Sequence, residues 1–258
     1  MKHAAAGSLL LALCLASPAW AQADGSPGAR FHRAIYDGDL EGVKALLASG
    51  LSPNTPIDRP NFTTTPVVLA SERGERDIVR TLVDAGADVN AKHHDKMRNV
   101  DHTALSMARE LDVEIVRTLL DKGARVDERV EFGGTVLMGA ARKGDPELIE
   151  VLLAAGANPN AEDDNGFTPL SCAVESGKES PVRTLVAKGA DVNHANAGWK
   201  MTPLHHAIRA GSVDMVKLLL ELKANPNART KAGETPLTLA RKGDQEEVIA
   251  LLQAAGAK

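Results

Sequence analysis

The chain has 258 residues, of which 43% are hydrophobic and 25% charged, with a net charge of −4. These values are ordinary for a globular protein, and they provide no basic excess to bind a phosphate backbone, so we expect no nucleic-acid partner. Only 3% of the residues are aromatic. The core must therefore rely on Leu, Val, Ile and Ala, which suits thin layers of small helices better than one thick core.

The first 23 residues have the pattern of a secretory signal peptide. Lys2 and His3 precede an apolar run from Leu9 to Ala16, and small residues flank two candidate cleavage points, 21/22 and 23/24. The run is too short for a membrane anchor, and no later run is long enough to span a bilayer. We expect a periplasmic or secreted protein without a membrane span, in which residues 24–258 form a single domain.

Cysteine usage agrees with that expectation. Leu13 precedes Cys14, whereas the signals of bacterial lipoproteins have Ala or Gly before the modified cysteine. We therefore interpret Cys14 as lost with the signal peptide. Cys172 is then the single cysteine of the mature chain, and no intramolecular disulfide can form.

The remaining chain is internally repetitive. TTTPVVLASERGERDIVRTLVDAGADVN from Thr63 aligns with GFTPLSCAVESGKESPVRTLVAKGADVN from Gly166 and with the segments that start at Met201 and Gly233. The common threonines are Thr65, Thr103, Thr135, Thr168, Thr202 and Thr235. The common glycines are Gly50, Gly86, Gly123, Gly156, Gly189 and Gly256, with Lys223 in the same position of the sixth repeat. From Gly123 onward their spacing is 33 or 34 residues.

Each repeat predicts two short helices and a turn. A threonine before proline starts the first helix, because its hydroxyl caps an N–H and proline gives up a donor that has no partner there. In the sixth repeat Gly211 ends this helix, and Val216, Leu219 and Leu220 follow at helical spacing. A left-handed glycine ends the second helix, and Asp-Val-Asn or Asn-Pro-Asn opens a turn. One repeat cannot bury its apolar face alone, whereas stacked repeats can.

This period and signature resemble the ankyrin repeat over about residues 29–257. The resemblance implies an all-α fold, an ankyrin-repeat α-solenoid of helix-turn-helix units joined by β-hairpin connections. We expect seven repeats including caps, at about 29–60, 61–97, 98–130, 131–163, 164–197, 198–230 and 231–258. The first lacks Thr-Pro, as an N-terminal cap does, and the last has polar residues from Asp244 to Glu247. A tetratricopeptide-like array is the alternative, but its Trp, Gly and Tyr positions are missing.

Two connections depart from the pattern. The connection from Ala91 to His102 is about five residues longer than its neighbours, and the one after Asn54 is also stretched. The third repeat has no glycine between its helices. We therefore expect a bend or a protruding hairpin between the second and third repeats.

Ankyrin arrays resemble one another in binding partners on a concave face, formed by the hairpin tips and the exposed side of each first helix. Phe31 is placed for core packing. The other five aromatic residues of the mature chain align with the concave face: Tyr36, Phe62, Phe132, Phe167 and Trp199. Because buried aromatic side chains contribute about 2 kcal/mol or more at interface hot spots, we predict a partner-binding stripe. Packing against the adjacent hairpin tip is the alternative.

Charged residues at the ends of the first helices extend this candidate site. They are Arg73, Arg142, Lys143, Glu175 and Arg209, together with Asp37, Glu72, Glu110 and Lys242. Acidic residues gather toward the N-terminal half and basic residues toward the C-terminal half. They either form a solvated face or match a partner of opposite polarity, whose register and association rate they would set.

Histidines raise the question of a metal. His93, His94, Asp95, Asp101 and His102 carry zinc-ligating groups, but we expect them in a flexible loop without fixed spacing, so we predict no metal and no cofactor. The resemblance implies that His205 bonds to the neighbouring repeat. We expect structural roles also for His206 and Cys172, half-buried against the second helix.

No enzyme signature is present: the sequence lacks a Gly-rich phosphate loop after a strand, GxSxG, HExxH and paired CxxC motifs. We therefore predict a monomeric, non-enzymatic protein-interaction module of the bacterial periplasm, with a housekeeping or stress-linked role. The alternative is an inhibitor or immunity protein against an effector that acts in the periplasm. An enzyme with a loop metal has less support.

Overall fold

The computed structural model describes residues 25–108, 112–129 and 131–258. The predicted signal peptide and the pair Glu110–Leu111 lie outside these ranges. The chain divides into two compact units, an N-terminal unit that ends at Ala104 and a C-terminal unit that begins at Leu105. Each is considered by itself. Within the described ranges, no helix has both the length and the apolar character needed to cross a membrane.

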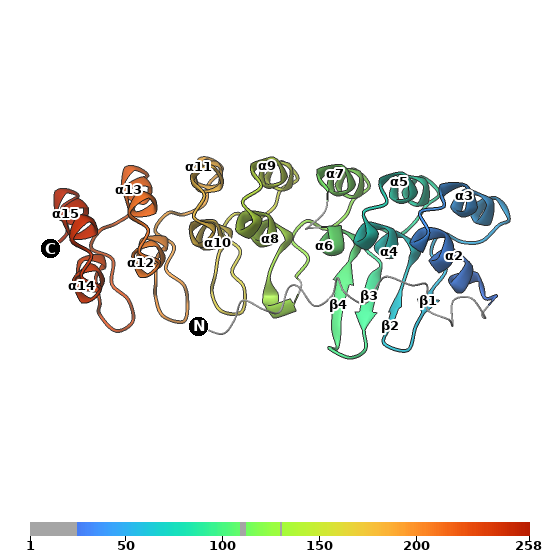
Figure 1. Ribbon diagram of the computed structural model, residues 1–258, viewed down its shortest axis with the longest axis horizontal. Helices are drawn as coiled ribbons and strands as arrows, with labels where there is room; N and C mark the ends of the chain where they lie inside the picture. The colour runs from blue at the N-terminus through green and yellow to red at the C-terminus, as the bar shows by residue number, and fades with distance from the viewer. Residues whose placement is uncertain (1–24, 109–111, 130) are drawn as a thin grey trace. The chain divides into compact units, whose positions relative to one another are not determined.

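The N-terminal unit contains two helix pairs and a small sheet (Figure 1). Helices α2 (Pro27–Tyr36) and α4 (Pro66–Arg73) pack together, as do α3 (Leu40–Ala48) and α5 (Arg76–Asp84). Strands β1 (Ile57–Asp58), β2 (Phe62–Thr64), β3 (Lys92–Asp95) and β4 (Val100–Thr103) form an antiparallel sheet in the order β1-β2-β3-β4. Phe31, as predicted from its position, is completely buried in this unit.

The two stretched connections form the two hairpins of this sheet. Lys92 pairs with Thr103 and Asp95 with Val100, so the hairpin expected between the second and third repeats is confirmed. The expectation of a flexible loop around His93, His94 and His102 is wrong, because the backbone there is paired as strands. The connections of the other repeats are only long enough for a turn. The extra residues of these two connections provide the backbone for strand pairing on either side of the turn.

The C-terminal unit consists of two rows of short helices (Figure 1). One row contains α6 (Ala104–Met107, its first residue at the division), α8 (Val136–Lys143), α10 (Pro169–Ser176), α12 (Pro203–Arg209) and α14 (Pro236–Lys242). The other contains α7 (Val113–Asp121), α9 (Pro146–Ala154), α11 (Glu179–Ala187), α13 (Val213–Glu221) and α15 (Glu246–Ala254). Consecutive helices of the same row pack on one another, as α8, α10, α12 and α14 do. These rows are the helix-turn-helix stack that the period predicts.

The connections between repeats in the C-terminal unit differ from the expected β-hairpins. From Leu105 onward, no described residue belongs to a strand, and a 3-10 turn, η2 (Glu131–Gly133), stands in one of the connections. Pairs of backbone hydrogen bonds close later connections. In one of them Asp163 N donates to Phe167 O and Gly166 N to Asp163 O, both at 2.9 Å. In the next, Asn196 N donates to Met201 O at 3.0 Å and Lys200 N to Asn196 O at 2.9 Å. The connections are therefore hairpin-shaped loops, too short to build a strand ladder.

Threonine begins most of the first helices as predicted. The hydroxyls of Thr135, Thr168 and Thr235 accept backbone N–H groups one turn into α8, α10 and α14. Thr65 makes no such bond, so the predicted side-chain cap is absent at α4. In α12 the backbone N–H of Thr202 donates instead to His205 Nδ1 at 3.1 Å.

The turn asparagines connect successive repeats. Asn160 Oδ1 accepts from Asp191 N at 2.8 Å, and its Nδ2 donates to Gly189 O at 3.0 Å. The same arrangement recurs at Asn54, Asn193 and Asn227. Beneath these turns lies the core, in which Leu204, Ala207 and Ile208 of one helix are at most 1% exposed.

Candidate functional site

The residues of the predicted binding face are distributed over both units. Tyr36, Phe62 and Arg73 belong to the N-terminal unit, and the other seven belong to the C-terminal unit: Phe132, Arg142, Lys143, Phe167, Glu175, Trp199 and Arg209. The two groups are described separately.

In the N-terminal unit the aromatic rings pack against cationic and imidazole side chains. The guanidinium of Arg73 lies 4.2 Å from the centre of the Tyr36 ring, which also stacks on His32 at 5.8 Å. Phe62 is half-buried, with Arg59 4.8 Å from its centre and His93 at 4.7 Å. Local packing, the alternative interpretation, describes these two rings well.

Burial also lowers the pKa values of two histidines in this unit. Burial, reinforced by Arg59 and Arg73, lowers the pKa of His32 to about 4. Burial, reinforced by His102, lowers the pKa of His93 to about 4 as well. Both rings are therefore neutral at neutral pH, and they pack as uncharged aromatic groups.

Two aromatic side chains project from the connections of the C-terminal unit. Phe132 is 69% exposed and Trp199 is 70% exposed. Their backbones are nevertheless fixed, because Phe132 O accepts from Asp164 N at 3.0 Å and Trp199 O accepts from Lys231 N at 2.8 Å. Each hydrogen bond joins one connection to the next. The two rings are thus presented to solvent on an ordered backbone.

Asn196 supports the loop that carries Trp199. This asparagine is 5% exposed, and its Oδ1 accepts from Met201 N at 2.8 Å and from Trp199 N at 3.3 Å. The buried side chain of Asn196 therefore pairs with backbone N–H groups that would bond to a neighbouring strand in a longer hairpin. Sequence analysis missed this residue, although an asparagine between the turn and the next Thr-Pro is a recognisable signal for a loop stabilised by its own side chain.

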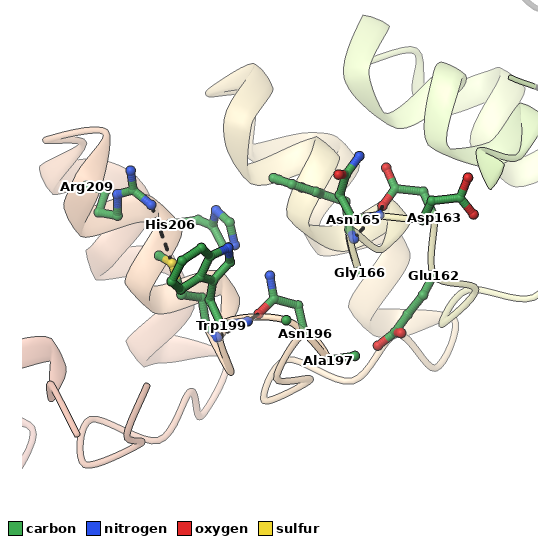
Figure 2. Close-up of a pocket in the computed structure, with 13 residues that line it drawn as sticks. Glu162, Asp163, Asn165, Gly166, Asn196, Ala197, Trp199, His206 and Arg209 are labelled. Atoms are coloured by element: carbon green, nitrogen blue, oxygen red, sulfur yellow. Dashed lines mark hydrogen bonds between the residues drawn. The ribbon is translucent and has the colours of Figure 1, made fainter. Parts of the chain in front are cut away.

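A pocket of about 510 Å³ lies beside Trp199, between the connection that contains residues 162–167 and the next one, which contains residues 196–201 (Figure 2). Phe167 is half-buried at its side, 5.1 Å from the His206 ring. Glu162, Asp163 and Asp164 also line it. Sequence analysis did not select these carboxylates, because only the folded connection brings them near the indole.

The predicted charged residues occupy neighbouring inner helices. Arg142 Nη2 donates to Cys172 Sγ at 3.4 Å, and Arg209 Nη1 donates to Met201 Sδ at 3.5 Å. Between them, partial burial raises the pKa of Glu175, Asp163 adds to that rise, and Arg142 and Arg209 oppose it. Lys143 Nζ lies 3.8 Å from Asp145. Basic and acidic groups therefore alternate from α8 to α12.

Two side chains that were assigned structural roles are completely buried. Cys172 is completely buried, and not half-buried as expected, because the next first helix closes over it; burial raises the pKa of its thiol to about 11. His205 is also completely buried, and burial lowers its pKa, while backbone groups of Ala228 in the same repeat and Glu234 in the next repeat oppose that lowering. Its Nε2 has no hydrogen-bond partner of normal geometry among the described residues, so the bond to the neighbouring repeat that the resemblance implied is not found.

The histidines and carboxylates of the β3–β4 hairpin serve strand pairing. His94 Nδ1 lies 2.9 Å from Asp101 Oδ1 across the hairpin, and this bond, ahead of Lys92, lowers the pKa of Asp101. No group of three His, Cys, Asp or Glu side chains that could hold a metal ion occurs among the described residues. At the tip of this hairpin Met97 is 77% exposed, a second feature that sequence analysis did not select.

Comparisons with known proteins agree with this architecture. The family model "Ankyrin repeats (3 copies)" matches residues 31–130, 125–196 and 182–258. The ankyrin repeat protein YahD of Escherichia coli K12 is 32% identical over 230 residues, which cover 87% of this chain and 94% of YahD.

Two solved structures are also similar. The ankyrin repeat domain of Bcl-3, a member of the IkappaB protein family, has a TM-score of 0.69 and 27% identity over 76% of this chain and 87% of that domain. An ankyrin repeat domain from Acinetobacter baumannii AYE has a TM-score of 0.67 and 31% identity, over 75% of this chain and 98% of that one. Proteins of this kind generally act as protein-interaction modules and are generally not enzymes. The chain belongs to the ankyrin-repeat family.

Proposed function

We propose that the chain is a monomeric, non-enzymatic binding protein of the bacterial periplasm, which holds a protein partner on the connections and inner helices of its C-terminal unit. The observation that carries this proposal is the exposure of Phe132 and Trp199, at 69% and 70%, on backbone that is already hydrogen-bonded. Large aromatic side chains are enriched among the residues that dominate interface energy.

The fixed backbone matters because ordering a loop on binding costs free energy. A side chain presented on a rigid connection avoids most of that cost, so more of the burial energy contributes to affinity. Phe132 also holds a left-handed backbone, with φ at +59°. This conformation costs a non-glycine residue about 1–2 kcal/mol. A strained, exposed aromatic residue is typical of a functional position.

The proposal is tested by capture from periplasmic extract. Wild-type protein is compared with a Phe132→Ala, Trp199→Ala double variant, which we expect to lose most of the captured partner. A matched control, Glu150→Gln with Lys217→Gln, changes two exposed residues on α9 and α13 of the other row. Circular dichroism of all three proteins verifies the fold. Equal capture by the double variant and the wild type contradicts the proposal.

Export is the other element of the proposal, and the pattern of residues 1–23 supports it. The test is fractionation of cells that express the full chain, followed by N-terminal sequencing. We expect periplasmic protein that begins at Gln22 or Asp24. Full-length protein confined to the cytoplasmic fraction contradicts it.

The identity of the captured partner separates the roles within this class. A resident periplasmic protein indicates a housekeeping or stress-linked role. An incoming effector whose activity falls on binding indicates an inhibitor or immunity protein.

A further inference from the structure

We propose that the pocket beside Trp199 binds the side chain of an arginine or lysine residue that the protein partner inserts between the connections of residues 162–167 and 196–201. This inference rests on the proposed function and names the chemistry that anchors the partner. It concerns a cavity inside the C-terminal unit, formed by two successive connections and by His206 and Arg209 of α12.

The pocket has aromatic and apolar surfaces suited to an aliphatic stem and a flat cation. Trp199 and Phe167 line it, together with Met201, which is 7% exposed. Figure 2 shows the indole of Trp199 and the ring of His206 side by side, between Arg209 and the acidic residues. A guanidinium or ammonium group is attracted to an indole face, and the methylene groups before it pack on apolar surface. The volume, about 510 Å³, lies within the range of about 300–1,000 Å³ that is typical of ligand sites.

His206 adds a hydrogen-bonding group to the wall of the pocket. Its side chain is 10% exposed and lines the pocket, and neither ring nitrogen makes a hydrogen bond within the described residues; the Glu175 carboxylate lies 3.9 Å from Nδ1. Burial, reinforced by Arg209 and His205, lowers its pKa to about 4, so the ring is neutral at neutral pH. A neutral imidazole has one ring nitrogen that accepts a hydrogen bond, so the ring can accept from an N–H group bound in the pocket.

The charge of the pocket selects a cation. Its lining contains three carboxylates, of Glu162, Asp163 and Asp164, and one guanidinium, of Arg209, which leaves a surplus of two negative charges. Arg129, 3.9 Å from Asp164, reduces this surplus from outside the pocket. His194 Nε2 lies 2.5 Å from Glu162 Oε1 and occupies that oxygen, which leaves Glu162 Oε2 for a ligand. Backbone N–H groups of Asn165 and Phe167 bond to Asp163 Oδ1 and hold that carboxylate in place.

Arg209 does not cancel the acidic end. Figure 2 shows it on the opposite side of Trp199 and His206 from Glu162 and Asp163, and it donates to Met201 Sδ at 3.5 Å. The pocket therefore has a negative end and a positive end. A basic side chain fits with its cation toward the carboxylates, whereas an acidic side chain meets repulsion there.

The test uses small probes on the purified full chain, followed by NMR of the Trp199 indole N–H, which is assigned by its loss in Trp199→Phe. The probes are N-acetyl-arginine amide and N-acetyl-lysine amide, with the neutral analogue N-acetyl-citrulline amide and the acidic N-acetyl-glutamate amide as controls. We expect saturable shifts with the two basic probes and binding weaker by about fivefold or more with the controls, as loss of a charge-assisted contact implies.

Variants then locate the site. Glu162→Gln with Asp164→Asn removes two charges and keeps side-chain shape, and we expect about fivefold or greater loss of affinity for the arginine probe. Glu150→Gln, an exposed carboxylate on α9 away from the pocket lining, serves as the matched control and leaves affinity unchanged. Equal binding of the citrulline and arginine probes, or no loss in the double variant, overturns the proposal.

The two proposals fail in different ways. If the basic probes do not bind but Phe132→Ala still reduces partner capture, the pocket assignment is wrong and the binding function stands. If the probes bind but capture is insensitive to Phe132 and Trp199, the pocket stands and the proposed partner-binding face is wrong.

Discussion

Lys223 occupies the helix-end position that a glycine fills in the other repeats. Its φ is +71°, and the six glycines have φ values from +85° to +98°. The fold therefore imposes a left-handed residue after each second helix, including the one repeat whose sequence supplies a side chain there. We predict that Lys223→Gly stabilises the protein.

The magnitude follows from two opposing terms. Relief of the left-handed conformation is worth about 1–2 kcal/mol for a residue with a Cβ. The additional freedom that glycine gives the unfolded chain removes about 0.4–1 kcal/mol of that gain. Lys223 is exposed, so its side chain adds little burial energy. The midpoints of the two terms, about 1.5 and about 0.7 kcal/mol, leave an expected net gain in the free energy of unfolding of about 0.8 kcal/mol.

The assay is urea denaturation followed by circular dichroism, with hydrogen exchange of α13 and α15 amides because repeat arrays can unfold in segments. Gly189→Lys is the reciprocal control: a Cβ at Gly189 meets no atom within 4 Å, so its penalty is conformational alone. We expect this variant to lose about 1 kcal/mol. A neutral or destabilising Lys223→Gly refutes the reasoning.

Three further predictions concern pH, thiol reactivity and the contacts between repeats. His32, His93 and His206 have pKa values lowered to about 4, so the folded state disfavours their protonation. The free energy of unfolding should be highest above about pH 6.5 and should fall as the pH drops from there toward about 4. A urea midpoint that stays constant over that window contradicts this prediction. Burial raises the pKa of the Cys172 thiol to about 11, so a thiol reagent at pH 8 should react with it only as the protein unfolds; rapid labelling of folded protein, with Cys14 replaced by Ser as the control, contradicts this. Asn160→Ala removes two hydrogen bonds between repeats and should lower the free energy of unfolding by about 1 kcal/mol, whereas an unchanged urea midpoint would show that these exposed bonds contribute nothing.

The sequence predicted the features that depend on local chemistry. Helix starts at Thr-Pro and left-handed positions at the common glycines follow from residues within one repeat. The long connection from Ala91 to His102 indicated a bend or a hairpin, and the hairpin is found, although the strand pairing around its histidines was not expected. Even Lys223 was assigned correctly by its position in the alignment. These features recur because each repeat must pack its apolar face against the neighbouring repeats in the same way.

Burial at equivalent positions could not be predicted in the same way. Phe62 and Trp199 both stand three residues before the common threonine, yet Phe62 is half-buried beside His93 and Trp199 is 70% exposed. The difference comes from the next connection, which continues as strand β3 beside Phe62 and is a short loop beside Trp199. Exposure thus depends on the neighbouring repeat.

The pocket was missed for the same reason. Glu162, Asp163 and Asp164 lie in one connection and Trp199 in the next, and nothing in either segment alone indicates a cavity. The burial of Cys172 was underestimated because α12 closes over α10. Contacts between repeats, rather than within them, determine the candidate site.

Calorimetry of the purified chain with its captured partner, with and without the two exposed aromatic side chains, shows whether Phe132 and Trp199 anchor that partner on the C-terminal unit. One hot-spot residue contributes about 2 kcal/mol or more, which corresponds to about 30-fold in affinity, and the contributions of two such residues need not add. The double alanine variant should therefore bind at least about 30-fold more weakly. The Glu150→Gln, Lys217→Gln control should bind as the wild type does. A double variant whose affinity is within about twofold of the wild type, which corresponds to about 0.4 kcal/mol, contradicts the account.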